Sequence, residues 1–201
     1  MKKTAWISFA VAYLILIAPC LAADLELSFT DQSVSETGFG IERADALAGP
    51  YKEIARPGAS ASSGAVVKYV DGGLPEAKYF CYRLFAFNNA GKSAYAGPVC
   101  GRTNATLTIV KTGTGAGTVT GALPVLSTDC GKSICVASVP GNAYIMLTVK
   151  PAAGSTFEGW GGACFGTRAT CSVTMNQARN VIAMFTLTVP NRPTELGMLS
   201  R

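Results

Sequence analysis

Residues 78–100, KYFCYRLFAFNNAGKSAYAGPVC, hold the pattern that decides the fold. Two runs rich in aromatic and small apolar residues flank the turn-forming stretch NNAG. This arrangement predicts two antiparallel strands, residues 78–88 and 92–100, joined in a hairpin. The expected register places Cys81 opposite Cys100, and facing residues have Cβ atoms close enough for a disulfide bond. We therefore predict a Cys81–Cys100 bridge.

The same register, in which Phe87 faces Ala94, divides the side chains between two faces. The inward set is predicted to be Phe80, Tyr82, Leu84 and Ala86. The aromatic residues of the outward set are Tyr79, Phe85 and Phe87. A flat row of exposed aromatic rings suits sugar rings or a partner protein, so these three residues form a candidate binding surface. The alternative is that other parts of the chain cover them.

Outside this hairpin, the chain consists of short alternating runs interrupted by Gly, Pro, Asn and Asp, with no sustained helical period. This pattern predicts an all-β protein. The composition changes near Arg102, where a charged segment gives way to one rich in Thr, Gly, Ala and Val. We therefore expect a domain at 24–103, a second at 104–187, the linker GRTNAT between them, and a flexible tail at 188–201.

The first 23 residues have the features of a signal peptide. Lys2 and Lys3 precede the apolar run AWISFAVAYLILIAP, and CLAA supplies small residues for cleavage after Ala22 or Ala23. An uncleaved anchor helix and lipidation at Cys20 are the alternatives. Cleavage predicts a secreted or cell-envelope protein, periplasmic or at the cell surface, with no stable membrane span.

Composition excludes several functional classes. The chain has no histidine, which removes Ser-His-Asp triads, Cys-His dyads and His-ligated metals. Without Lys2 and Lys3 it has 15 basic and 12 acidic residues, and this balance is too weak for a nucleic-acid footprint. Acidic residues such as Asp71, Glu36 and Glu158 form no pair with a catalytic context. We expect no enzyme, cofactor, metal or nucleic-acid partner.

Six cysteines follow the predicted signal peptide, and an even number in an exported chain favours disulfide bonds. In the second segment we favour the local pairs Cys130–Cys135 and Cys164–Cys171, with cross-pairing as the alternative. The spacings fit neither zinc knuckles nor a Cys-x-x-Cys redox motif. Trp160, set among glycines, is expected in the core, with an exposed platform for glycans as the alternative.

Residues 25–103 resemble a bacterial fibronectin type III domain, on the pieces LELSFTDQSVSETGFGIERA, GPYKEIA and YVDGGLPEAKYFCYRLFAFNNAGKSAYAG. The resemblance implies a seven-strand, immunoglobulin-like sandwich. Its first strand, strand A, has no counterpart after signal cleavage, because Leu25 already belongs to the second strand. The sandwich then tolerates the loss, fills the gap with another segment such as the tail, or accepts a strand from a partner at the open edge near Leu25.

Residues 104–187 resemble a divergent internalin-type B-repeat domain. The pieces that carry this resemblance are ATLTIVKTGTGAGTVTG, DCGKSIC, YIMLTVKPAAGSTFEGWGGAC and TCSVTMNQARNVIAMF. It implies a small all-β fold, stapled by disulfides, with an extracellular role, and it supplies no binding residue.

The two resemblances together imply a non-catalytic exported or cell-envelope protein. Its β modules are of the adhesion or ligand-binding type, and its ligand is an unidentified protein or polysaccharide. The alternative is an inert spacer, or the remnant of a larger multidomain surface protein.

Overall fold

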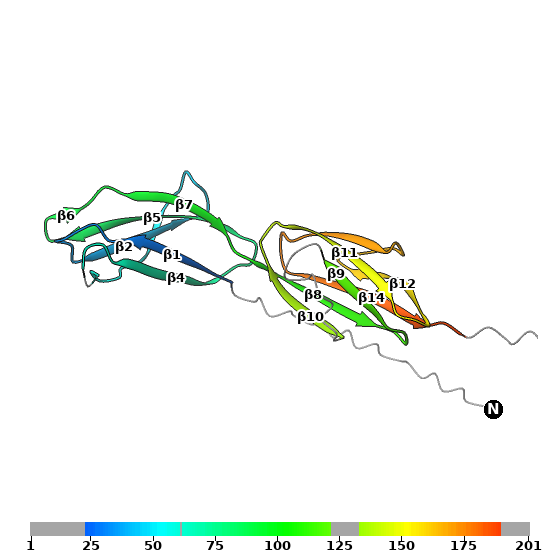
Figure 1. The fold of residues 1–201 in the computed structure, drawn as a ribbon. Helices are drawn as coiled ribbons and strands as arrows, with labels where there is room; N and C mark the ends of the chain where they lie inside the picture. Colours follow the sequence, from blue (N-terminus) through cyan, green and yellow to red (C-terminus); the bar gives the residue numbers. More distant parts are fainter. Residues whose placement is uncertain (1–22, 61, 122–132, 190–201) are drawn as a thin grey trace, which may run out of the picture.

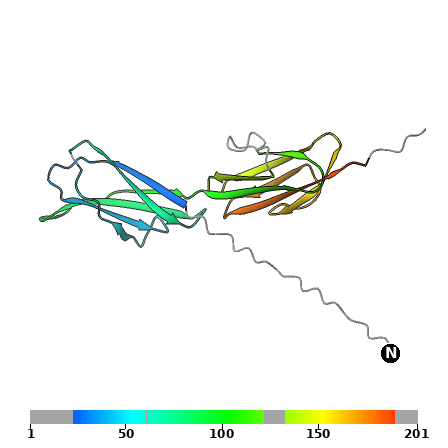
Figure 2. The same cartoon turned by 90° about the horizontal axis from the view of Figure 1, so that it is seen from below.

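The computed structural model describes residues 23–60, 62–121 and 133–189. All regular elements among these residues are β-strands, which form four sheets. The predicted all-β class is confirmed. Figures 1 and 2 show the strands gathered in two groups placed end to end. We call β1–β7 the N-terminal module and β8–β14 the C-terminal module.

The N-terminal module consists of two sheets. In the first, β1 (Ala23–Thr30) pairs antiparallel with β4 (Val66–Leu74). The second sheet has the order β3-β2-β5-β6, with β7 also paired to β5. Its strands are β2 (Gly38–Ala44), β3 (Lys52–Ala55), β5 (Tyr79–Asn88), β6 (Gly91–Lys92) and β7 (Ala96–Arg102).

The C-terminal module also has two sheets, with the orders β10-β8-β14-β12 and β13-β11-β9. The first contains β8 (Ala105–Thr112), β10 (Ile134–Val139), β12 (Ser155–Gly162) and β14 (Arg179–Leu187). The second contains β9 (Gly117–Gly121), β11 (Tyr144–Pro151) and β13 (Thr170–Thr174). Strands β8 and β14 run parallel, and the other pairs are antiparallel.

The alternation in YIMLTVK holds in the C-terminal module. Ile145, Leu147 and Val149 face the core and are at most 5% exposed, whereas Tyr144 and Met146 face outward. Among the described residues, seventeen buried side chains form the core. Burial of apolar surface on this scale is the main stabilising contribution to such a module.

The predicted linker GRTNAT is a tight junction. Thr103 is fully buried; its hydroxyl donates to the Pro75 carbonyl at 2.7 Å and accepts from the Lys78 amide at 2.8 Å. The Glu76 carboxylate accepts from both the amide and the hydroxyl of Thr106, at 2.9 and 2.6 Å. Ala77, from the turn between β4 and β5, belongs to the core of the C-terminal module. These contacts fasten the end of one module to the start of the other.

Two predicted disulfide bonds are present, Cys81–Cys100 and Cys164–Cys171. Cys135 is also disulfide-bonded, and its predicted partner, Cys130, lies outside the described residues. The same holds for the signal segment 1–22 with Cys20, and for residues 190–201 of the predicted tail. Among the described residues, no helix has the length and hydrophobicity to cross a membrane.

Candidate binding groove

The N-terminal sandwich is open along one side. Within the described residues, β1 pairs with β4 alone, so its other edge has no neighbour. In the opposite sheet, β7 pairs with β5 alone. Figure 1 shows β1 and β4 on one side of the module and β2, β5 and β7 on the other.

A groove runs along this open side. One part has a volume of about 440 Å³ and lies between the middle of β1 and the facing parts of β5 and β7. A second part, of about 690 Å³, continues toward the loop after β1. The two parts share the residues Phe29, Leu84 and Ala96. We call this continuous space the open groove.

The open groove has an apolar floor. Leu25, Leu27 and Phe29 alternate along β1 with exposed polar residues, yet each of the three is only partly buried. Across the groove, Val99 of β7 is 61% exposed. Side chains that a neighbouring strand covers in a complete sandwich therefore remain in contact with water.

The two edges of the groove differ in protection. Strand β7 contains Pro98, which has no amide hydrogen to donate, and Gly97, whose φ of 96° accompanies a register shift between Tyr82 and Leu84. Irregularities of this kind discourage the addition of a further strand. Strand β1, ADLELSFT, has a register shift only at its start, between Ala23 and Leu25, and its regular part from Leu25 to Thr30 contains no Pro, Gly or Lys. The edge of β1 is therefore the better acceptor of a strand.

A buried polar network braces the sandwich behind the groove. Asp71, 6% exposed, accepts hydrogen bonds from Arg43 and from the Tyr82 hydroxyl, both at 2.8 Å. Burial, followed by the hydrogen bond to Asp71, raises the pKa of Tyr82 well above its ordinary value. Tyr82 therefore stays protonated and contributes an uncharged side chain to the lining of the groove.

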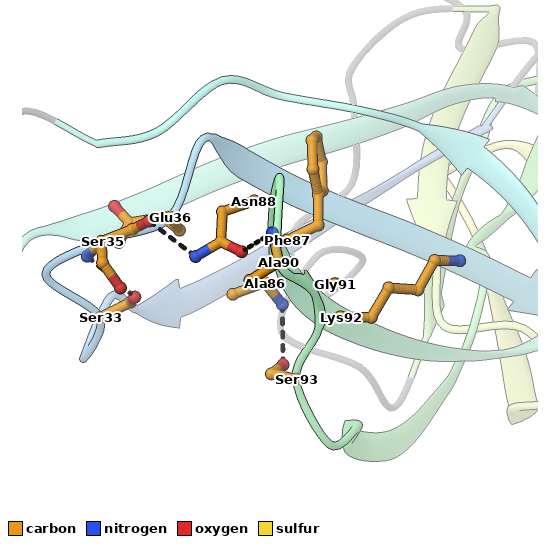
Figure 3. A pocket seen from close by; sticks show the side chains of 10 residues that line it. All are labelled: Ser33, Ser35, Glu36, Ala86, Phe87, Asn88, Ala90, Gly91, Lys92 and Ser93. Carbon is orange, nitrogen blue, oxygen red and sulfur yellow. Dashed lines mark hydrogen bonds between the residues drawn. The ribbon is translucent and has the colours of Figure 1, made fainter.

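A smaller polar pocket of about 290 Å³ lies at the tip of the same module (Figure 3). Its hydrogen bonds are local to the turns. Asn88 donates to the Ser35 carbonyl and accepts from the Ala90 amide, and the Ala86 amide donates to the Ser93 hydroxyl. The Glu36 Oε2 atom, also in this pocket, is buried without a hydrogen-bond partner. We assign no ligand to this pocket.

The predicted aromatic surface is not a continuous exposed row. Phe85 is 1% exposed, although it occupies the outward side of β5 as expected. Its ring lies against Gly40 of β2, where any side chain would collide with the ring. Tyr95 packs edge-on at 5.5 Å, and the Lys92 ammonium lies 4.1 Å from the ring centre. The predicted exposure of Phe85 is wrong, because its ring packs against Gly40 on one side and is covered by Tyr95 and Lys92.

The other two predicted surface residues lie apart from each other. Tyr79 is 38% exposed, with the Arg102 guanidinium 5.6 Å from its ring centre. Phe87 is half-buried, with Arg56 at 5.1 Å. The predicted pairing of Phe87 with Ala94 is also wrong: Phe87 faces Lys92, and a register shift restores the Cys81–Cys100 pairing further along.

Sequence reasoning missed the cluster that occupies this outer face. The Arg83 guanidinium lies 4.3 Å from the ring centre of Tyr51 and 4.0 Å from that of Tyr95. It is also paired with Glu42 at 2.6 Å, and Tyr95 donates to the same carboxylate. The Arg83 charge is therefore balanced by the Glu42 carboxylate and by contact with the two tyrosine rings. The residues of this cluster come from parts of the chain far apart in sequence, so no local sequence signal pointed to it.

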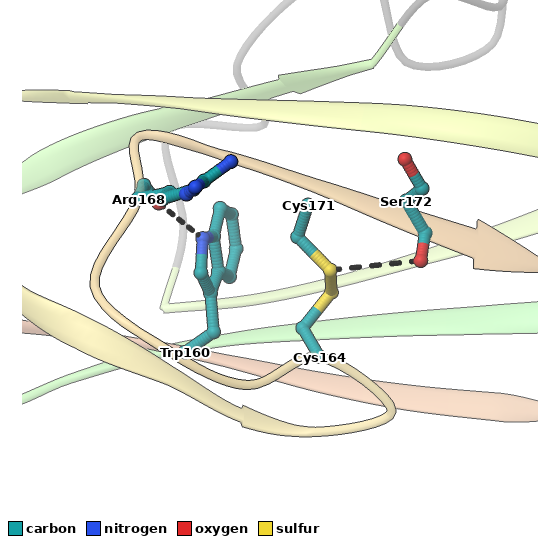
Figure 4. The surroundings of a disulfide bond; sticks show 5 residues. All are labelled: Trp160, Cys164, Arg168, Cys171 and Ser172. Carbon is teal, nitrogen blue, oxygen red and sulfur yellow. Dashed lines mark hydrogen bonds between the residues drawn. A yellow bond between two sulfur atoms is a disulfide. The ribbon is translucent and has the colours of Figure 1, made fainter.

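The stretch around Trp160 is structural (Figure 4). Trp160 is 5% exposed and donates its indole N–H to the Arg168 carbonyl at 2.8 Å. Its ring packs edge-on against Phe157 at 5.2 Å. The Cys164–Cys171 bond closes the loop beside it. The predicted core role of Trp160 is confirmed.

Two of the acidic residues considered from the sequence make contacts within their own modules. Asp71 is paired with Arg43, and Glu158 accepts a hydrogen bond from Thr186. Within the three described ranges, no group of three or more Cys, Asp or Glu residues lies close enough to hold a metal ion.

Comparison with known proteins places the C-terminal module. Residues 106–189 match the family model of the divergent InlB B-repeat domain. This family consists of bacterial surface-type repeat domains. No curated protein matches the chain. The resemblance drawn from GTGAGTVTG and the later strands is therefore confirmed for this module.

Proposed function

We propose that this chain is a non-catalytic, exported protein of the bacterial cell envelope that binds another polypeptide at the open groove. Its N-terminal module is of the fibronectin type III kind and lacks the first strand. The strand order supports this assignment, because β1 and β4 form one sheet and β3, β2, β5 and β7 the other, as in that sandwich without strand A.

The unprotected edge of β1 carries the proposal. An exposed strand edge presents unpaired N–H and C=O groups, and an added strand satisfies them. Leu27 and Phe29 offer apolar contacts to alternate side chains of such a strand. A groove with this floor and this edge fits an extended polypeptide.

A polypeptide is favoured over a polysaccharide because the predicted surface aromatic residues are not freely exposed to solvent. Sugar-binding platforms need flat rings that are open to solvent. Phe85 is covered by Tyr95 and Lys92, and Phe87 lies beside Arg56. The outer face therefore offers no open platform among the three residues singled out from the sequence.

Export is supported by the disulfide bonds and by the family of the C-terminal module. Disulfide bonds persist in oxidising compartments and are rare in the reducing cytosol.

A spacer role is the second candidate, and the junction favours it. Thr103 and Glu76 tie the modules directly, and Gly141 lies so close to the Thr103 carbonyl oxygen that a side chain there would collide with it. Such a junction suits a stiff rod that holds other parts away from the cell. The binding role requires a polypeptide in the open groove, whereas the spacer role does not.

Site-specific photocrosslinking in the producing cells tests the proposal. A photoreactive phenylalanine analogue replaces Ser28 on the free edge of β1, and Thr148 on the exposed face of β11 serves as the matched control. We expect a discrete polypeptide adduct from position 28 and none from position 148. Equal labelling at the two positions, or none at either, would contradict the binding role and leave the spacer role.

A further inference from the structure

We propose that the strand added at the open edge is β1 of a second copy of this chain. The two β1 strands pair antiparallel about a two-fold axis at Leu27, which joins two two-stranded sheets into one of four strands. This proposal rests on the proposed function, because it names the polypeptide that the groove binds.

The charges of β1 favour antiparallel self-pairing. Its outward side chains are Asp24 and Glu26 in the first half, with Glu26 paired to Lys68 of β4 at 2.7 Å, and Ser28 and Thr30 in the second. In an antiparallel pair centred on Leu27, Glu26 faces Ser28 of the partner and Asp24 faces Thr30 of the partner. A parallel pair would instead place like charges opposite each other, which is destabilising.

The apolar residues of β1 match in the same register. Leu27 faces Leu27 of the partner, and Leu25 faces Phe29 of the partner. Each of these side chains is only partly buried within one chain. Directly opposed apolar side chains on neighbouring strands contact each other, so the pairing buries surface that one chain leaves exposed.

Strand β7 forms the other wall of the groove in which the added strand lies. Val99, 61% exposed in one chain, lies on that side. A closed two-fold contact gives a dimer and no larger assembly, since each copy uses its free β1 edge once.

A pair of charge changes at Thr30 tests this register. Thr30 is exposed and faces Asp24 of the partner, with Glu26 of the partner on the diagonal. Thr30→Lys adds an opposite charge at each of two symmetric positions, and Thr30→Glu adds a like charge. We expect the dimer dissociation constant to fall about three- to ten-fold with Thr30→Lys and to rise by a similar factor with Thr30→Glu.

The measurement is sedimentation velocity of the exported chain over a range of concentrations, with its N-terminus read by mass spectrometry. Thr148→Lys and Thr148→Glu are the controls for net charge, because Thr148 lies on an exposed face away from β1. Hydrogen exchange of the unchanged chain adds a readout that needs no variant. Protection of the β1 amides is expected to rise with protein concentration.

Each outcome decides between the claims. Opposite shifts at position 30 with no shift at position 148 support the dimer. A chain that stays monomeric, or a dimer insensitive to position 30, overturns it. If the purified chain is monomeric while position 28 still crosslinks to a different polypeptide in cells, the second-copy inference fails and the proposed function stands. If neither assay gives contacts at β1, both fail.

Discussion

The two modules achieve stability in different ways. In the part of the chain that the structure describes, the C-terminal core has seventeen buried residues, all apolar, and its Leu147 lies on β11 between β9 and β13. The corresponding N-terminal cluster has four buried residues, and seven more that are only partly buried. The N-terminal module instead buries acidic residues, Asp31, Glu42 and Asp71, each with a hydrogen-bonding partner.

The difference follows from the number of strands in the facing sheets. Four strands over three cover most of the apolar face in the C-terminal module. In the N-terminal module, a two-stranded sheet faces a wider one, so one side stays open and apolar burial is smaller. Polar pairs and the Cys81–Cys100 bond then contribute a larger share of the stability.

The largest effect is expected in the closed core. Leu147→Ala should lower the free energy of unfolding of the C-terminal module by about 3 kcal/mol, because it removes fully buried methyl groups and leaves a cavity. Trp160 is the only tryptophan after the predicted signal peptide, so its fluorescence during urea unfolding reports on this module. A loss below about 1 kcal/mol would contradict a tightly packed core.

The next effect concerns the polar network of the open module. Asp71→Asn removes the charge that pairs with Arg43 and accepts from Tyr82, and should cost about 2 kcal/mol. Hydrogen exchange of β4 and β5 measures it, while the Trp160 transition serves as the control. If the Trp160 transition shifts equally, the two modules unfold as one unit and do not have separate stabilities.

A smaller effect is expected at the groove. Leu27→Ala should cost about 1 kcal/mol in the isolated chain, since Leu27 is only partly covered. Urea unfolding followed by exchange of the β1 amides measures it. A cost near that of Leu147→Ala, growing with protein concentration, would mean that a second chain covers Leu27.

The smallest effect is a dependence on pH. The hydroxyl of Ser60 and then the amide of Ser33 hold the pKa of Asp31 below its ordinary value of 3.8. The ionised form is therefore favoured by folding, and this stabilisation is complete above pH 3.8 and lost as the pH falls below it. Asp31→Asn should flatten the acid side of the stability curve of the N-terminal module. An unchanged acid limb would show that other carboxylates dominate it.

Alternation along single strands was enough to assign many side chains. It placed Phe80, Tyr82 and Leu84 inward and paired Cys81 with Cys100, as observed. The same rule failed for the exposure of Phe85, because the side of a strand does not say what the next strand carries. Gly40 and Tyr95, distant in sequence, bury that ring.

The open groove was predicted only in part. The resemblance predicted an open edge near Leu25, but it did not predict the opposite wall, which contains Val99. The position of that wall depends on the register shift between Tyr82 and Leu84, where residues of β7 and β5 cease to pair one to one. A local sequence pattern carries no information on such a shift.

The sequence by itself determined the all-β class, two of the disulfide bonds, the family of the C-terminal module and the burial of Trp160. Each of these depends on local periodicity, on short spacing or on a pattern that spans one module. The tertiary structure alone decided that Phe85 is covered, that GRTNAT is a tight junction and that a groove lies between β1 and β7. These depend on contacts between residues far apart in the chain, whose distances are fixed only when the sheets pack against each other.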